Sequence, residues 1–143
     1  MLAVWTKQLK SSNFAYIGQF WKYLQKHKAA IAAGKIIICG DFNGNVRWDN
    51  RRRSWNHGDL VRELEEIGIR SVYHHANAEI QGGETRPTFF LHRDRAKSYH
   101  IDYAFVSSDF VNEMQVTCEV GEIETWLPIS DHLPIAFSLP KLS

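Results

Sequence analysis

The feature that most constrains the fold is the stretch Lys35–Asn45, in which an apolar run ends in an acid, an amide and glycines. Its three consecutive isoleucines, Ile36–Ile38, are β-branched, and Gly34 and Gly40 bound the run. A short, continuous apolar run between glycines is typical of a strand that is buried on both faces. We therefore predict a central strand of a sheet that ends at Asp41.

Two polar side chains follow at the end of this strand. Because successive side chains of a strand point to opposite faces, Asp41 and Asn43 face one side and Phe42 the other. Gly40 lets the backbone turn or approach another group closely. The acid and the amide therefore share one small volume, either as caps of a turn or as part of a functional site.

Size and composition bound the possibilities. The 143 residues are enough for one domain with a sizeable core, and 44% apolar with 23% charged residues exclude a disordered chain. The net charge of +1 says little about partners. Cys39 and Cys118 form neither a disulfide framework nor a zinc-binding spacing, which favours a reducing cytoplasm. No apolar run approaches the roughly 18 residues of a membrane span, and residues 1–5 do not resemble a signal peptide.

Apolar periodicity predicts an α/β fold. We expect strands over residues 2–5, 35–41, 70–77, 88–92, 101–107, 114–119 and 133–139, and helices over residues 13–33 and 59–68. Helices come early and hairpins late, which indicates a mixed, mostly antiparallel sheet of about six strands with two helices on one face. Several strands are apolar on both sides, so something else must cover the second face of the sheet.

Two more polar triplets lie at predicted strand edges. His100–Asp102 opens one apolar strand, and Ser130–His132 precedes the last one. If the later strands run antiparallel to the first, these acids and the histidine meet Asp41 at one edge of the sheet. Carboxylate oxygens hold Mg²⁺ and a second acid can orient an imidazole, which suits chemistry on phosphate esters. Taken singly, Asp102 could be a turn residue and His132 a hydrogen-bonded histidine at a sheet edge.

These motifs carry a family resemblance. GDFN at residues 40–43, IDY at 101–103 and SDH at 130–132, in this order and strand context, resemble the endonuclease/exonuclease/phosphatase superfamily. The resemblance covers residues 2–139. It implies a metal-dependent phosphodiesterase or phosphomonoesterase, and a fold that is half of a four-layer α/β sandwich.

The resemblance also implies roles for individual residues. Asp41 would orient or deprotonate the attacking water and, with Asp131, would sit at the metal. Asn43 would hold a phosphate oxygen. His132, held by Asp102, would stabilise charge on the phosphate. The implied cofactor is Mg²⁺, with Mn²⁺ as an alternative, weakly bound or absent in the isolated chain.

The chain differs from the family in length. Family domains are nearly twice as long, and their amino-terminal half brings an asparagine and a metal-binding glutamate that have no counterpart here. We therefore expect residues 1–143 to be the carboxyl-terminal half of such a domain, impaired or inactive as a hydrolase on its own. The expected partner for the second sheet face is another copy of the chain or the missing half. A non-catalytic, self-associating remnant is the rival interpretation.

Basic residues cluster in two loops beside the predicted site, one after the GDFN motif and one before residue 100, with Trp48, Trp55 and Tyr99 interleaved. This mixture suits nucleic acid, with a small phosphate ester as the second candidate and phosphate binding without turnover as a third. The alternative is that these are two solvated loops with no role in binding, because charge clusters are common in loops. Tyr16 is similar to a family tyrosine that reaches the phosphate, or is a tyrosine at the edge of the core. The candidate substrate-binding residues are Tyr16, Asn45, Arg51, Arg52, Arg53, Arg93 and Arg95.

Overall fold

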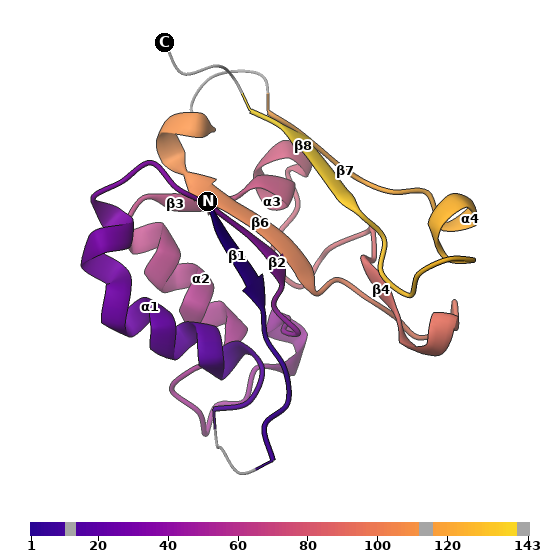
Figure 1. Cartoon of the computed structure of the whole chain (residues 1–143), viewed down its shortest axis with the longest axis horizontal. Coiled ribbons are helices and arrows are strands. Elements are labelled where there is room, and N and C mark those ends of the chain that lie inside the picture. Colours follow the sequence, from indigo (N-terminus) through magenta and orange to yellow (C-terminus); the bar gives the residue numbers. More distant parts are fainter. Residues whose placement is uncertain (11–13, 112–115, 140–143) are drawn as a thin grey trace.

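A four-stranded sheet forms the centre of the protein. The computed structural model describes residues 1–10, 14–111 and 116–139. Counted across the sheet, its first two strands are parallel to each other, and its third strand is antiparallel to the strand on either side. In spatial order the strands are β1 (Leu2–Trp5), β2 (Ile37–Asp41), β6 (Asp102–Ser107) and β3 (Ile69–Ser71) (Figure 1). The predicted central strand is therefore confirmed as an inner strand.

Two amphipathic helices cover one face of this sheet, as predicted. These are α1 (Ile17–Ala32) and α2 (His57–Glu66). Leu24 and Leu64 from the helices pack with Ile38 and Phe105 from the sheet in one core. A capping box formed by Asn56 and Asp59 fixes the start of α2, because each side chain bonds the other residue's backbone N–H.

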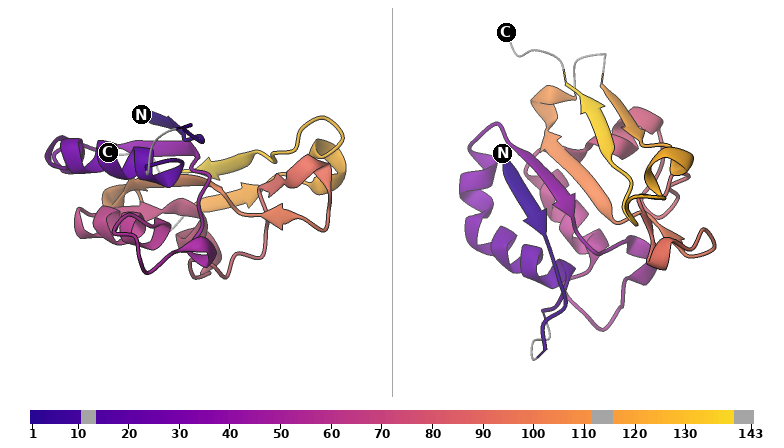
Figure 2. Two further views of the ribbon diagram at one scale, coloured as in Figure 1. Left: turned by 90° about the horizontal axis from the view of Figure 1, so that it is seen from below. Right: turned by 45° about the vertical axis from the view of Figure 1, so that its right-hand side comes forward.

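The second face is covered in part by a separate hairpin. Its strands, β7 (Thr117–Val120) and β8 (Ile135–Ser138), pair with each other and not with the central sheet. Val120 and Leu133 pack on Ala104 and Val106, which alternate along β6 with the residues facing the helices. Figure 2 shows the hairpin beside β6, on the far side from α1. The fold is thus mixed α/β with mostly antiparallel pairing, as predicted, and in the described part of the chain the strands form one four-stranded and two two-stranded sheets.

The strand predicted over residues 70–77 is wrong beyond Ser71. The strand ends at Ser71, and Val72–Asn77 forms helix α3. Val72 and Tyr73 are buried and Ala76 is half-buried, so these residues lie on one helical face against the second core.

The remaining elements are short. The predicted strand 88–92 shrinks to β4 (Phe89–Phe90), which pairs with β5 (Ser98–Tyr99). Residue 13 of the predicted first helix and residues 114–115 of the predicted strand 114–119 lie outside the described residues. The other short helices are η1 (Val46–Trp48), η2 (Leu91–Arg93), η3 (Ser108–Phe110) and α4 (Ile123–Trp126).

Gly40 allows β1 to pack tightly against β2. Its φ is 142°, and an added Cβ would lie 1.9 Å from the carbonyl oxygen of Val4. Just beyond this contact, the Thr6 N–H donates to Asp41 O at 3.0 Å, and the Thr6 hydroxyl donates to Phe42 O at 2.6 Å. The close approach therefore holds the end of β1 against the turn that follows β2.

Candidate active site

The turn after β2 is built around the Asp41 carboxylate. Asn43 donates its backbone N–H to Oδ1 at 2.9 Å and its side-chain amide to Oδ2 at 2.6 Å. The amide also donates to Thr6 O at 2.9 Å. Asn43 has a φ of 46°, a left-handed conformation that asparagine tolerates. Both amide hydrogens of Asn43 are engaged within the protein, so this residue supports Asp41 in the structure.

Asp41 is half-buried, and burial raises the pKa of its carboxyl group. The Asn43 hydrogen bonds oppose this rise, and the negative charge of Asp102 adds to it. Asp102 is the residue directly opposite Asp41 in the antiparallel β2–β6 pair. The sheet register therefore brings together two acids from distant parts of the sequence, as predicted.

Asp102 binds the imidazole of His132. Nδ1 of His132 lies 3.0 Å and 3.2 Å from the two carboxylate oxygens. This hydrogen bond is the largest cause of a raised pKa at His132, against which partial burial acts. The His132 side chain is 36% exposed and that of Asp102 is 17% exposed. With Nδ1 held by the acid, Nε2 is the ring nitrogen left for a ligand.

Thr88 was missed by sequence reasoning and ties these two residues together. It is fully buried, and its hydroxyl oxygen accepts the N–H groups of Ile101 and Asp102, each at 3.1 Å. Its carbonyl accepts the N–H of Leu133 at 2.7 Å. One residue thus fixes the segments before and after the Asp102–His132 contact. A threonine after a proline carries no sequence signal for this role.

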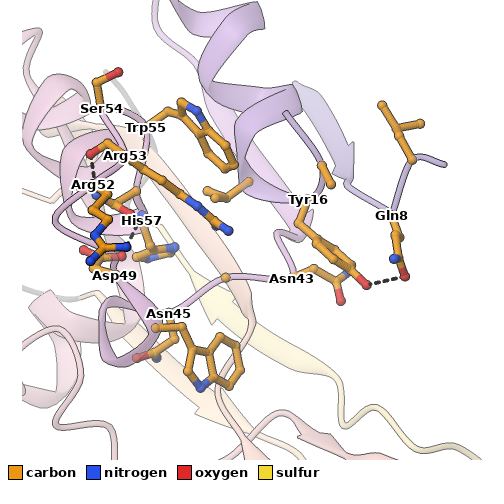
Figure 3. A pocket seen from close by; sticks show the side chains of 16 residues that line it. Gln8, Tyr16, Asn43, Asn45, Asp49, Arg52, Arg53, Ser54, Trp55 and His57 are labelled. Carbon is orange, nitrogen blue, oxygen red and sulfur yellow. Dashed lines mark hydrogen bonds between the residues drawn. The ribbon is translucent and has the colours of Figure 1, made fainter. Parts of the chain in front are cut away.

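A cleft of about 830 Å³ opens on the Asn43 side of the site. We call it the basic cleft, because Arg52 and Arg53 line one end and Tyr16 and Asn43 the other (Figure 3). Arg53 lies over the ring of Trp55, 4.8 Å from its centroid. Arg51, Arg52 and Arg53 are all exposed. The first predicted basic loop therefore borders the site, with two of these three arginines in the cleft.

Tyr16 is 38% exposed at this cleft, and its hydroxyl donates to Gln8 Oε1 at 3.2 Å. Asn45 also lines the cleft but is only 4% exposed. Its amide nitrogen lies 3.1–3.2 Å from Glu84, His100 O and the Tyr103 hydroxyl. These contacts make Asn45 an internal link rather than an exposed ligand group.

The second basic loop has different contacts. Arg93 donates to the carbonyls of Pro128 and Ile129, at 3.1 Å and 3.3 Å. Arg95 forms a two-pronged ion pair with Glu124, at 2.8 Å and 2.6 Å. These two arginines join the loop after β4 to the segment around α4.

A second hollow, the apolar groove, borders the site on the other side. It measures about 710 Å³ and contains Asp41, Asp102 and His132 at its polar end. Trp5 and Trp126 line the groove and are 75% and 37% exposed. The second face of the sheet is therefore covered only in part.

Comparison with known proteins decides the family. The family model for the endonuclease/exonuclease/phosphatase family matches residues 15–132. The chain belongs to this family. No sequence among the curated proteins matches it.

Two solved structures support the family fold. One is a 3′-5′ exonuclease from Neisseria meningitidis, with a TM-score of 0.55 and 20% identity over 83% of this chain and 54% of that one. The other, from Neisseria, is described as a 3′ phosphatase bound to a product DNA hairpin, with a TM-score of 0.55 and 20% identity over 85% and 55%. The chain thus spans about half the length of these family structures.

Members of this family typically depend on a divalent metal ion. Among residues 1–10, 14–111 and 116–139, no group of three or more His, Cys, Asp or Glu side chains could hold one. Both oxygens of Asp41 accept hydrogen bonds from Asn43, and Asp131 is half-buried beside His132. The described residues therefore do not form a complete cation site. In the same part of the chain, no helix is both long and apolar enough to cross a membrane.

Proposed function

We propose that this chain is a phosphoester hydrolase of the nuclease type. The observation that carries the proposal is the Asp102–His132 pair beside a half-buried acid, Asp41, at the edge of one sheet. This arrangement joins a group that can accept a proton to one that can stabilise negative charge.

The proposed reaction starts with water. Asp41 accepts a proton from the water as the water oxygen bonds to phosphorus. The raised pKa of Asp41 favours this role. The imidazole of His132, which Asp102 keeps in place, stabilises charge on the phosphate oxygens through Nε2. The ester P–O bond then breaks, the leaving alkoxide takes a proton from solvent water, and Asp41 returns its own proton to solvent. Asn43 holds Asp41 in position, and it could bind a phosphate oxygen only by giving up an internal hydrogen bond.

A divalent ion such as Mg²⁺, or Mn²⁺ in its place, would supply a Lewis acid when bound. Asp41 and Asp131 are the two carboxylates that we propose for it. Two carboxylates suffice for Mg²⁺ only when substrate oxygens or other groups complete the shell, so we expect weak binding to this chain alone.

The proposed substrate is nucleic acid, with a small phosphate ester as the second candidate. The exposed arginines of the basic cleft support phosphate contacts, and Trp55 and Trp48 offer faces for stacking. One similar structure is described as bound to a DNA hairpin. Phosphate binding without turnover would use the same cleft and is an outcome of the test below.

We further propose that residues 1–143 correspond to the carboxyl-terminal half of a family domain, and that turnover by this chain alone is low. Nearly half of each similar structure lies outside the match. Another polypeptide would cover the apolar groove, either a second copy or an amino-terminal half. Light scattering of the chain, alone and mixed with such a half, tests this proposal. A chain that stays monomeric and does not bind the amino-terminal half contradicts the proposed partner.

The test of function is turnover on plasmid DNA and on an aryl phosphate diester, with Mg²⁺ or Mn²⁺. The chain is compared with its His132→Ala and Asp41→Asn variants, with and without an amino-terminal half. We expect low turnover that rises when the half is added and falls at least about 100-fold in both variants. Turnover that persists in both variants contradicts the assigned roles. DNA binding without turnover in any mixture favours the alternative, a protein that binds phosphate groups without hydrolysing them.

A further inference from the structure

A buried carboxylate lies behind the candidate site. The side chain of Glu84, from the segment between α3 and β4, is 2% exposed. One of its oxygens accepts from His74 Nε2 at 3.0 Å and from the N–H of Gly82 at 2.9 Å, and the other from Asn45 Nδ2 at 3.2 Å. Burial alone would raise the pKa of Glu84, but these hydrogen bonds lower it to about 2. The group is therefore a charged acceptor in the interior.

The surrounding hydrogen bonds demand a group that only accepts. Nδ1 of His74 lies 2.7 Å from the Ser71 hydroxyl and 3.2 Å from the amide nitrogen of Gln81. An amide nitrogen only donates, so Nδ1 accepts and the ring proton is on Nε2, which faces Glu84. All three partners of the carboxylate are thus donors. A glutamine at this position would direct an NH₂ group at one of them.

Asn45 extends this arrangement to both halves of the site. Its amide nitrogen also lies 3.1 Å from the carbonyl of His100 and 3.1 Å from the hydroxyl of Tyr103. That hydroxyl lies 3.2 Å from the carbonyl of Gly44. Asn45 is two residues beyond Asn43, and His100 is two residues before Asp102. The link therefore joins the turn that supports Asp41 to the entry of the strand that carries Asp102.

We propose that Glu84 is a positioning residue, which acts through Asn45 to fix the distance between the Asp41–Asn43 turn and Asp102. Its catalytic consequence rests on the proposed function, but its effect on the turn does not. A hydrogen-bonded network in the interior favours one arrangement, and the loss of one acceptor leaves its donors unpaired. The turn then samples positions in which Asp41 no longer faces Asp102 correctly.

The experiment compares Glu84→Gln with Glu79→Gln. Glu79 lies in the same loop and accepts from Tyr73 and Thr85 at 2.5–2.9 Å, without a contact to Asn45. The readout is hydrogen exchange of the Asn43 backbone N–H, which bonds Asp41, relative to a core amide of α1 such as that of Leu24. We expect exchange at least tenfold faster in Glu84→Gln and within twofold of the parent in Glu79→Gln.

A second variant keeps the proposal testable if Glu84→Gln does not fold. If Glu84→Gln does not fold by circular dichroism, Asn45→Ala breaks the same link from the other side, with the same expected result. Asn43 exchange within twofold of the parent in the variant that folds overturns the proposal. So does equal acceleration in Glu79→Gln, or failure of both Glu84→Gln and Asn45→Ala to fold, because the role is then general stability.

Activity gives an independent measurement. Where the parent turns over substrate, Glu84→Gln should lower kcat at least tenfold and change KM less than threefold, because the residue does not touch substrate. If Asn43 exchange is faster in Glu84→Gln but the parent shows no turnover, alone or with the amino-terminal half, the result supports the positioning role and contradicts the proposed function. The two proposals can therefore fail separately.

Discussion

Asp41 and Asp102 are direct register partners on adjacent antiparallel strands, and Asp102 also holds Nδ1 of His132. Like charges so close disfavour ionisation of Asp41, while the histidine favours it. Antiparallel pairing of β2 with β6 places the two acids together. The fold thus gathers three ionisable side chains that no short motif contains.

Replacement Asp102→Asn should lower the pKa of His132, because the hydrogen bond to the acid is the largest cause of its raised value. A raised histidine pKa stabilises the fold below the ordinary value of about 6.5, and the benefit is lost as pH rises through the folded-state value. NMR titration of the His132 ring checks the direction. Asp94→Asn, in the exposed loop after β4, is the control and should leave His132 unchanged; equal titrations in both variants would contradict the pair.

His57 should make the protein sensitive to mild acid. Burial lowers its pKa to about 3, so between pH 6.5 and 3 the unfolded chain binds a proton that the folded one does not. Stability therefore falls as pH drops through this window, by about 2 kcal/mol between pH 6.5 and pH 5. Urea unfolding at pH 7 and pH 5 measures the decrease. His57→Leu should reduce it, and an unchanged difference would assign the effect to other groups.

The two basic loops should differ in nucleic-acid binding. The triple variant Arg51→Ala, Arg52→Ala, Arg53→Ala should reduce the slope of log K against log salt by about 2–3, because each phosphate that an arginine neutralises adds roughly 0.7–0.9 to that slope. Replacing Arg93 and Arg95, which are engaged with Pro128, Ile129 and Glu124, should change the slope less. Fluorescence anisotropy with a labelled single strand at several salt concentrations gives both slopes. Equal slopes for the triple variant and the parent would remove the first loop from the interface.

Gly40→Ala should destabilise the protein by at least about 2 kcal/mol, because the new methyl group meets the carbonyl of Val4 and the φ of 142° is strained for alanine. Gly34→Ala is the matched control, since an added Cβ there has no atom within 4 Å. It should change stability by less than about 0.5 kcal/mol. Thermal unfolding of both variants measures the difference, and similar melting temperatures would contradict the close packing of β1.

The central strand and both long helices could be predicted because their apolar patterns are long and regular. Residues 70–77 could not, since Val72 and Tyr73 have high strand propensity while the packed environment selects a helix. Strand pairing was equally hidden. Thr117–Val120 buries alternate residues, and this pattern does not tell whether a strand extends a sheet or packs across it.

The candidate site, like the fold, could be predicted only in part. Asp41, Asn43, Asp102 and His132 come together as their strand-edge positions indicated. The supporting residue Thr88 could not be found, because its role depends on backbone N–H groups that carry no sequence signal. Arg93 and Arg95 looked like Arg51–Arg53 in the sequence, and only tertiary contacts distinguish them.

The contacts that close the site have a consequence for how the protein folds. Asp102 and His132 are 30 residues apart, Thr6 and Phe42 are 36 apart, and Asn45 and His100 are 55 apart. Contacts across such separations cost loop-closure entropy and form slowly, whereas helices form in microseconds or less. The sheet edge that carries the candidate site is therefore expected to be completed late in folding, after α1 and α2 have formed. A fluctuation that releases β1 from β2 would break the hydrogen bonds by which Thr6 holds the turn after β2.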